Sequence, residues 1–310
     1  MDRRKFIQYA MVAGGTTMLP GWLNAASPAF LSEDAKLHKL TILHTNDVHS
    51  RIDPFPMDGG RNQGQGGIAK RSALLKQIRA EEQNVLLLDA GDMFQGTPYF
   101  NYFKGELELK LMSQLGYDAG TIGNHDFDAG IENLQQQIQG FAKFPLVNCN
   151  YNFENTVMKG MAQPYTIIQK GPIKVGITGV GVELNGLVPA ALTKETQYQS
   201  PIELADKYAG ILRHDHHCDY VICLSHLGYS YKENKVSDMV MAKETKHIDL
   251  IIGGHTHTFL SVPTIVENSV GKEVLVTQAG WAGIMLGRLD IYFERNRKQK
   301  CVLCKNTFIE

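Results

Sequence analysis

Residues of the types that bind divalent metal ions follow most of the apolar runs in this sequence. Carboxylate oxygens, imidazole nitrogens and an amide oxygen together suit zinc, manganese or ferrous iron. Two ions held close together need a shared ligand, and Asp92, a single carboxylate beside Gly91, is the expected bridge. The other candidate ligands are Asp47, His49, Asn124, His226, His255 and His257. The set predicts a centre for two divalent metal ions.

The candidate ligands divide into two shells that share Asp92. Asp47 and His49, with one of the two histidines of residues 255–257, suit the first ion. Asn124 and His226, with the other histidine, suit the second ion. The residue types leave open which histidine serves which ion.

Other polar residues carry weaker predictions. Residues 214–217 (His-Asp-His-His) are dense enough to suggest a metal, but they precede an expected strand and should lie at the opposite edge of the sheet. Asp126 is expected either to cap a helix or to hydrogen-bond a ligand. Arg51 has two interpretations, contact with a substrate phosphate or a solvated salt bridge. His44, within an apolar run, is expected to have its hydrogen bonds satisfied in the core or beside the ligands.

Short β-branched runs predict the strands that position these side chains. In an open α/β sheet, ligands gather at the carboxyl ends of the strands, so we expect the candidate ligands at one edge. Neighbouring glycines allow the loops to pack tightly around a small site. Strands are expected at residues 40–43, 85–88, 119–122, 146–147, 175–178, 220–224 and 250–252.

Amphipathic stretches alternate with these runs and predict an α/β architecture. From residue 274 onward the pattern changes, because strands at 274–277 and 285–293 have no helix between them. This predicts antiparallel pairing late in the chain. Helices are expected at residues 68–82, 107–115, 131–138, 201–212 and 235–245.

A long loop and a group of aromatic residues flank the first motifs. Residues 53–67 are rich in Pro and Gly and form either an active-site wall or a solvated insertion. The aromatic side chains after Asp92 could line a pocket, although core packing is the expected role. These aromatic residues are Phe94, Tyr99, Phe100, Tyr102 and Phe103.

Composition limits the class of protein. The 310 residues are enough for two average domains or one large α/β domain. With 31 Lys and Arg against 32 Asp and Glu, the chain lacks the basic excess of a nucleic-acid binder. Five scattered cysteines do not form a disulfide framework, and most are expected to be buried free thiols.

Residues 1–27 are typical of an export signal. A charged segment that includes Arg3, Arg4 and Lys5 precedes a mildly apolar stretch at 9–23 and small residues at 25–27. The Arg-Arg-x-Phe-Ile core resembles a twin-arginine signal; an ordinary secretory signal and an uncleaved anchor are the alternatives. The apolar stretch is too short and too rich in Gly and Thr for a good membrane span. A periplasmic or otherwise exported protein is expected, with no stable membrane span after signal removal.

The chemical motifs match, in order and residue type, those of the calcineurin-like metallophosphoesterases. The motifs are Asp47-x-His49, Gly91-Asp92, Gly123-Asn124-His125-Asp126, His226 and Gly254-His255-x-His257. The stretches 42–49 and 123–128 also resemble the secreted 5′-nucleotidase family, as do Gln278-Ala279-Gly280 and residues 286–289. The resemblance covers roughly residues 38–295.

The resemblance implies a fold and a role for each matched residue. It implies a single catalytic domain at residues 38–300, folded as an α+β or α/β four-layer αββα sandwich of two mixed β-sheets flanked by helices. His125 matches the family's catalytic histidine, and Asp128 matches the carboxylate that holds it. The family often has Gln or Asn where His257 stands. The implied ligands are Asp47, His49, Asp92 and His257 at the first ion, and Asp92, Asn124, His226 and His255 at the second.

The implied reaction is an in-line displacement at phosphorus. Two ions about 3.5–4 Å apart clamp the attacking and leaving oxygens. The expected nucleophile is a bridging water that loses its proton near neutral pH. His125, kept as imidazolium by Asp128, would stabilise the phosphoryl oxygens and the departing alkoxide.

Substrate identity is less constrained. Secreted nucleotidases usually carry a second domain that stacks the base, and this chain ends soon after its catalytic motifs. Either a separate specificity-domain protein docks on it, or local loops recognise a different substrate. The principal hypothesis is a phosphomonoesterase for 5′-nucleotides. The alternatives are a phosphodiesterase for 2′,3′-cyclic nucleotides or nucleotide sugars, a hydrolase of other phosphomonoesters or of sulfur esters, and a non-catalytic subunit, against which the intact Asn124-His125 pair argues.

Overall fold

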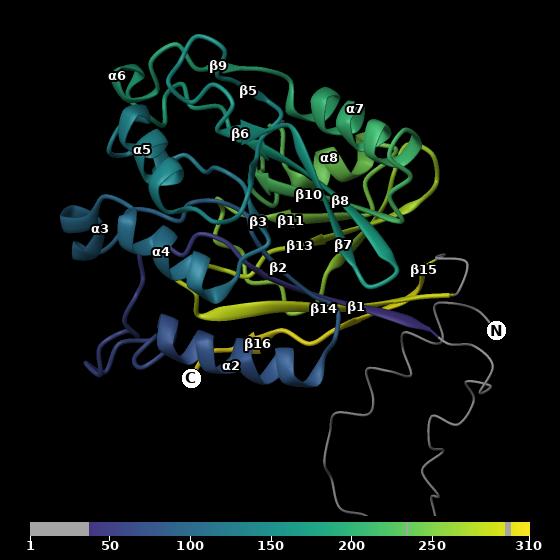
Figure 1. The fold of residues 1–310 in the computed structure, drawn as a ribbon, viewed down its shortest axis with the longest axis horizontal. Helices are drawn as coiled ribbons and strands as arrows, with labels where there is room; N and C mark the ends of the chain where they lie inside the picture. Colours follow the sequence, from purple (N-terminus) through teal and green to yellow (C-terminus); the bar gives the residue numbers. More distant parts are fainter. Residues whose placement is uncertain (1–36, 234, 295–298) are drawn as a thin grey trace, which may run out of the picture. The chain divides into compact units, whose positions relative to one another are not determined.

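The structure is a computed structural model that describes residues 37–233, 235–294 and 299–310 (Figure 1). Residues 37–310 form one compact unit. The predicted export signal at 1–27 lies outside the described residues. Within the described part of the chain, no helix is both long and apolar enough to cross a membrane.

The larger sheet contains eight strands and is mixed. Three strands are antiparallel neighbours at one side: β14 (Met285–Phe293) pairs with β1, and both β15 (Gln299–Cys304) and β16 (Thr307–Phe308) pair with β14. The parallel strands, in spatial order, are β1 (His38–Thr45), β2 (Val85–Asp89), β3 (Ala119–Gly120), β4 (Leu146–Val147) and β6 (Ala162–Gln163).

The smaller sheet contains six strands and is also mixed. Its edge strands, β7 (Tyr165–Lys170) and β12 (Thr264–Glu267), are antiparallel to their neighbours. A separate two-stranded ribbon joins β5 (Tyr151–Asn152) and β9 (Gln197–Tyr198). The parallel strands of the smaller sheet are β8 (Ile173–Gly181), β10 (Tyr220–His226), β11 (Leu250–Gly253) and β13 (Glu273–Thr277).

Helices cover the outer faces of the two sheets. Their buried residues follow the helical period, as at Ile131, Leu134 and Ile138. Beside the larger sheet lie α2 (Ile68–Glu81), α3 (Pro98–Phe103), α4 (Glu106–Leu115) and α5 (Ile131–Phe141). Beside the smaller sheet lie α7 (Pro201–His214) and α8 (Asp238–Glu244), and a short α6 spans Ala190–Thr193.

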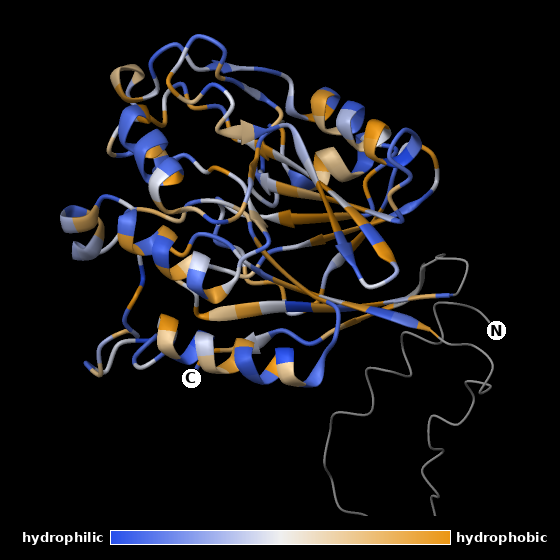
Figure 2. Cartoon of the chain, viewed as in Figure 1, coloured by the Kyte–Doolittle hydropathy of each residue, from blue (hydrophilic) through white to orange (hydrophobic). Residues whose placement is uncertain are grey.

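Alternate residues of the central strands face opposite sides of the larger sheet. Ile42, Leu86 and Leu88 pack between the two sheets, whereas Leu43 and Leu87 pack on the helix side. Figure 2 shows these interior strands as largely hydrophobic, while the helices carry both kinds of residue. Burial on both faces explains why the runs read as continuous apolar segments. The expected fold, two mixed sheets flanked by helices, is confirmed.

Three predictions about strand length, helix start and strand pairing need correction. The third strand is only two residues long, and the helix expected at 235–245 begins at Asp238, where Ser237 accepts a hydrogen bond from the Val240 N–H. The late strands do include antiparallel pairs, but β13 and β14 lie in different sheets. The reason is the loop between them, in which Gly280, Ala282 and Gly283 all have positive φ and lead the chain from one sheet to the other.

Candidate metal centre

All seven predicted ligands meet at the carboxyl ends of strands. Asp47, Asp92 and Asn124 follow β1, β2 and β3 of the larger sheet, within a few residues. His226 ends β10, and the two terminal histidines follow β11 of the smaller sheet. The sequence predicted one sheet edge; the structure instead joins the edges of two sheets.

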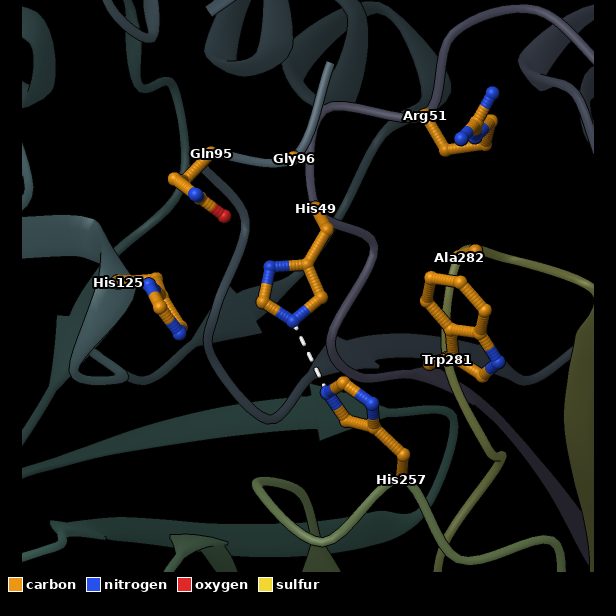
Figure 3. A pocket seen from close by; sticks show the side chains of 8 residues that line it. All are labelled: His49, Arg51, Gln95, Gly96, His125, His257, Trp281 and Ala282. Carbon is orange, nitrogen blue, oxygen red and sulfur yellow. Dashed lines mark hydrogen bonds between the residues drawn. The ribbon is translucent and has the colours of Figure 1, made fainter.

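The first group contains Asp47, His49 and His257. The Nε2 atoms of His49 and His257 lie 3.1 Å apart (Figure 3). Asp47 Oδ1 is 3.4 Å from His257 Nε2 and 3.9 Å from His49 Nε2. One carboxylate and two imidazoles therefore point at a common centre.

The second group contains Asp92, His226 and His255. Asp92 Oδ2 lies 3.0 Å from His226 Nε2 and 3.8 Å from His49 Nε2, so this carboxylate stands between the two groups. Asn124 Oδ1 lies 2.8 Å from His255 Nδ1. The distances place Asp92 where a shared ligand would lie.

Backbone carbonyls fix the orientation of two imidazoles. His226 Nδ1 lies 2.7 Å from the Ala90 carbonyl, and His49 Nδ1 lies 3.3 Å from the Phe94 carbonyl. These contacts direct Nε2 of both rings toward the carboxylates, and a metal-binding imidazole is oriented in this way by a partner at its other ring nitrogen.

Five of the predicted ligands have backbone φ angles in the left-handed region. Asp47, His49, Asp92, His255 and His257 have φ between 50° and 71°. Such a conformation costs a non-glycine residue about 1–3 kcal/mol and is concentrated at functional sites. The surrounding hydrogen bonds therefore hold these ligands in place at a cost to stability.

Glycines allow the ligand loops to approach each other. A Cβ atom on Gly123 would lie 2.2 Å from Asp92 Oδ1, and one on Gly254 would lie 2.8 Å from His226 Nδ1. Gly91 has φ 88°, and its Cβ would lie 2.7 Å from the Gly123 nitrogen. A side chain at these positions would displace a predicted ligand or the backbone beside one.

Asp126 holds the loops after β2 and β3 together. Its carboxylate accepts backbone N–H groups from Asp92 (3.1 Å), Met93 (2.9 Å), Phe94 (3.1 Å) and Gly123 (2.8 Å). Of the two roles expected for Asp126, the structure shows the hydrogen bond to a predicted ligand, because Asp126 accepts the backbone N–H of Asp92.

The buried carboxylates of Asp92 and Asp47 give the centre a negative charge that a cation would neutralise. Burial alone lowers the pKa of His226, but the carboxylates of Asp92 and Asp47 raise it to about 10. Burial opposes ionisation of Asp92, yet the imidazoles of His226 and His49 hold its pKa below the usual range. Two buried carboxylates thus require positive charge beside them, and the oxygen and nitrogen donors fit divalent ions.

His125 and Asp128 form a pair beside the ligands. His125 Nδ1 lies 2.9 Å from Asp128 Oδ2, and this hydrogen bond raises the pKa of His125. The backbone N–H of His125 also donates a hydrogen bond to Asp92 Oδ1 at 2.8 Å. With 39% of its side chain exposed, His125 is open to a ligand in the pocket.

A pocket of about 220 Å³ opens above the first group (Figure 3). Arg51 lies over the Phe55 ring at 4.1 Å and, among the described residues, makes no salt bridge. Trp281, Gln95 and Ala282 were not predicted from the sequence, because isolated loop residues carry no periodic signal. The lining residues are His49, Arg51, Gln95, Gly96, His125, His257, Trp281 and Ala282.

The loop at 53–67 contacts one residue of this pocket, because Phe55 packs edge-on against Trp281 with ring centroids 5.7 Å apart. Of the aromatic residues after Asp92, Phe94 and Phe100 are in the core, whereas Tyr102 is 83% exposed. The histidine-rich segment 214–217 lies before β10, away from the ligand end of that strand.

The expectation of a satisfied His44 is wrong. Both of its ring nitrogens are buried, and neither has a hydrogen-bond partner among the described residues. The ring lies over Gly287 of β14, where a Cβ atom would be 2.0 Å from Nε2. Burial lowers the pKa of His44 to about 3, so the imidazole is neutral.

The sequence matches a known protein family and several curated relatives. The model of the calcineurin-like phosphoesterase family matches residues 40–259. Snake venom 5′-nucleotidase of Crotalus adamanteus is 36% identical over 294 residues, which is 86% of this chain and 47% of that protein. Human 5′-nucleotidase is 33% identical and covers 89% of this chain, with 50% of its own length matched.

Solved structures agree with this match. A 5′-nucleotidase precursor from Thermus thermophilus has a TM-score of 0.77 and 32% identity, covering 87% of this chain and 54% of that one. The NAD nucleotidase of Haemophilus influenzae has a TM-score of 0.76 and 25% identity, and the match covers 88% of this chain and 56% of that one. The chain spans about half the length of these relatives. Since the family model matches most of its length, the chain belongs to the calcineurin-like phosphoesterase family.

Proposed function

We propose that this protein is an exported phosphoesterase that hydrolyses phosphate monoesters, principally 5′-nucleotides, at a centre of two divalent ions. The observation that carries the proposal is the meeting of two ligand groups at Asp92, with the His125–Asp128 pair at the same pocket. Family membership and the 5′-nucleotidase names of several relatives support the substrate class.

The proposed ligands follow the two groups. Asp47, His49, Asp92 and His257 would hold the first ion, and Asp92, Asn124, His226 and His255 the second. The ions, zinc, manganese or iron, would neutralise charge on the phosphoryl oxygens and lower the pKa of a water.

His125 is the proposed proton donor. Asp128 accepts the Nδ1 hydrogen, so the protonated ring presents its Nε2 hydrogen to the pocket. From there it would stabilise a phosphoryl oxygen and donate to the departing alkoxide. A positioned general acid of this kind contributes about 10²–10⁴-fold to a rate.

A substrate panel tests the proposal. The chain, stripped with EDTA and reloaded with Mn²⁺, Zn²⁺ or Fe²⁺, is assayed with AMP, 2′,3′-cyclic AMP and UDP-glucose. We expect kcat/KM for AMP to exceed the others at least tenfold, and an Asp92→Asn variant prepared identically to be inactive. Preference for cyclic AMP would instead assign a phosphodiesterase. No turnover with any metal would contradict the proposal.

Export is tested at the N-terminal segment. In a bacterial host, replacing Arg3 and Arg4 together by Lys keeps the charge but removes the twin-arginine pair. We expect this variant to stay unprocessed in the cytoplasm, while the Lys5→Arg control reaches the periplasm. Export of both proteins would favour the ordinary secretory route.

A further inference from the structure

Trp281 stacks on one of the predicted ligands. Its indole ring and the His257 imidazole are nearly parallel, at 4°, with centroids 5.6 Å apart (Figure 3). This separation lies within the range in which aromatic pairs attract each other. The same imidazole directs Nε2 toward Asp47 and His49 in the first group.

His257 is held differently from His49 and His226. Those two rings are oriented by bonds from Nδ1 to backbone carbonyls. Within the described part of the chain, His257 Nδ1 has no such bond, and 40% of the side chain is exposed. The ring faces of His257 are therefore restrained by two neighbours, the His49 ring edge-on at 5.1 Å and the stacked indole of Trp281, and of these only the indole lies parallel to the imidazole.

The loop that carries Trp281 is fixed to the segment that carries Asp47. The Ala282 N–H donates to the Asp47 carbonyl at 2.7 Å. The Asn46 side chain donates to the Gly280 carbonyl at 2.6 Å and accepts the Ala279 N–H at 2.8 Å. Trp281 thus has a fixed position relative to another ligand of the same group.

We propose that Trp281 is a positioning residue for the first metal site. Its indole holds the His257 ring so that Nε2 faces the first ion, in place of the carbonyl bond that orients His49 and His226. The proposal rests on the ligand role proposed above for His257. Loss of an outer partner of a ligand lowers metal affinity about 10–100-fold, and here the loss should fall on one site of two.

Metal titration tests this in the absence of substrate. Mn²⁺ binding to the native protein, Trp281→Ala and Trp281→Phe is followed by calorimetry, and electron paramagnetic resonance distinguishes single ions from coupled pairs. The matched control is Tyr102→Ala, which removes an aromatic ring that is 83% exposed. We expect Trp281→Ala to bind one ion normally and the second at least tenfold more weakly, while the Phe variant and the control bind two ions almost as the native protein does.

A second variant separates positioning from general loosening. In a His257→Gln background, Trp281→Ala should cause no further loss, because the indole then has no imidazole to orient. The inference is overturned if Trp281→Ala binds both ions normally, weakens both equally, or keeps its full effect beside His257→Gln. Two ions in the native protein with no change in the variant would refute this inference alone, whereas fewer than two ions in the native protein would refute the proposed centre as well.

Discussion

At the scale of single residues, Asp92 connects every part of the centre. Its carboxylate lies 3.8 Å from His49 and 3.0 Å from His226, and it accepts the backbone N–H of His125. Its own backbone has φ 55° and is held by Asp126. The position of the proposed acid is thus tied to that of the proposed bridging ligand.

Replacing His125 should separate metal binding from turnover. His125→Ala removes the proposed proton donor without removing a proposed ligand, so we expect kcat for AMP to fall about 10²–10⁴-fold. Asp128→Asn should reduce kcat less, because the imidazole remains while its orientation and charge are less favoured. Elemental analysis should still find two ions in each variant; native kcat in His125→Ala would exclude the residue from the mechanism.

At the scale of elements, the loops after the strands depend on a few long-range acceptors. Asp126 alone satisfies four backbone N–H groups from the loops after β2 and β3. These donors are buried, and an unsatisfied buried donor costs about 1–3 kcal/mol. The ligand loops therefore keep their shape through a residue that is not itself a proposed ligand.

Removing this acceptor should destabilise the fold even without metal. We expect Asp126→Ala to lower the free energy of unfolding in EDTA by about 3 kcal/mol or more. Asp126→Asn keeps one acceptor oxygen and should lose less. Urea denaturation measures the effect, with Glu195→Ala, an exposed carboxylate, as the control. Equal stability of Asp126→Ala and the control would show that other groups satisfy the four donors.

His44, which lies in β1 against β14, makes the free energy of unfolding depend on pH. Its pKa is about 3 in the folded protein, against about 6.5 for a histidine in an unfolded chain. Between these values the unfolded state binds more protons, so this residue reduces stability as the pH falls below 6.5. Above pH 6.5 the His44 ring is neutral in both the folded and the unfolded state, so folding requires no loss of a proton there.

A non-titrating residue at position 44 should remove this term. We expect the free energy of unfolding of the native protein, relative to His44→Leu, to fall by up to about 1.4 kcal/mol per pH unit between pH 6 and 4. Denaturation in EDTA at each pH measures the difference. A constant difference between the native protein and His44→Leu would contradict the prediction.

At the scale of the whole molecule, the centre joins the two sheets. Asp47, Asp92 and Asn124 come from the larger sheet, and His226, His255 and His257 from the smaller. Each ion would therefore bridge the halves of the sandwich. Binding to the folded state alone should stabilise it by mass action.

Metal removal should lower the melting temperature. At a free metal concentration one hundred times the Kd, each site contributes about 2.7 kcal/mol. For two sites this corresponds to a Tm roughly 10 °C or more higher than in EDTA. Calorimetry with and without Mn²⁺ measures the shift, which should shrink in Asp92→Asn. An identical Tm in both conditions would be incompatible with two tightly bound ions.

The types and order of the proposed ligands, and the strands that precede them, can be predicted from the sequence. Apolar runs followed by Asp47, Asp92 and His226 are local patterns, and the carboxyl ends of parallel strands bring such residues together. The motifs around Asn124 and His255 add the family and, with it, the two-sheet fold. Each motif is a group of residues close together in the chain, and the order of the motifs along the chain is read directly from the sequence.

The remaining features depend on contacts between residues that are distant in the chain. Contacts between Trp281 and His257, between Asp126 and the Asp92 loop, and between His44 and Gly287 join residues from different parts of the chain. The assignment of β13 and β14 to different sheets is of the same kind. Local periodicity shows which face of an element is apolar, but it does not show which distant side chain packs against that face, because that depends on how the whole chain closes around its core.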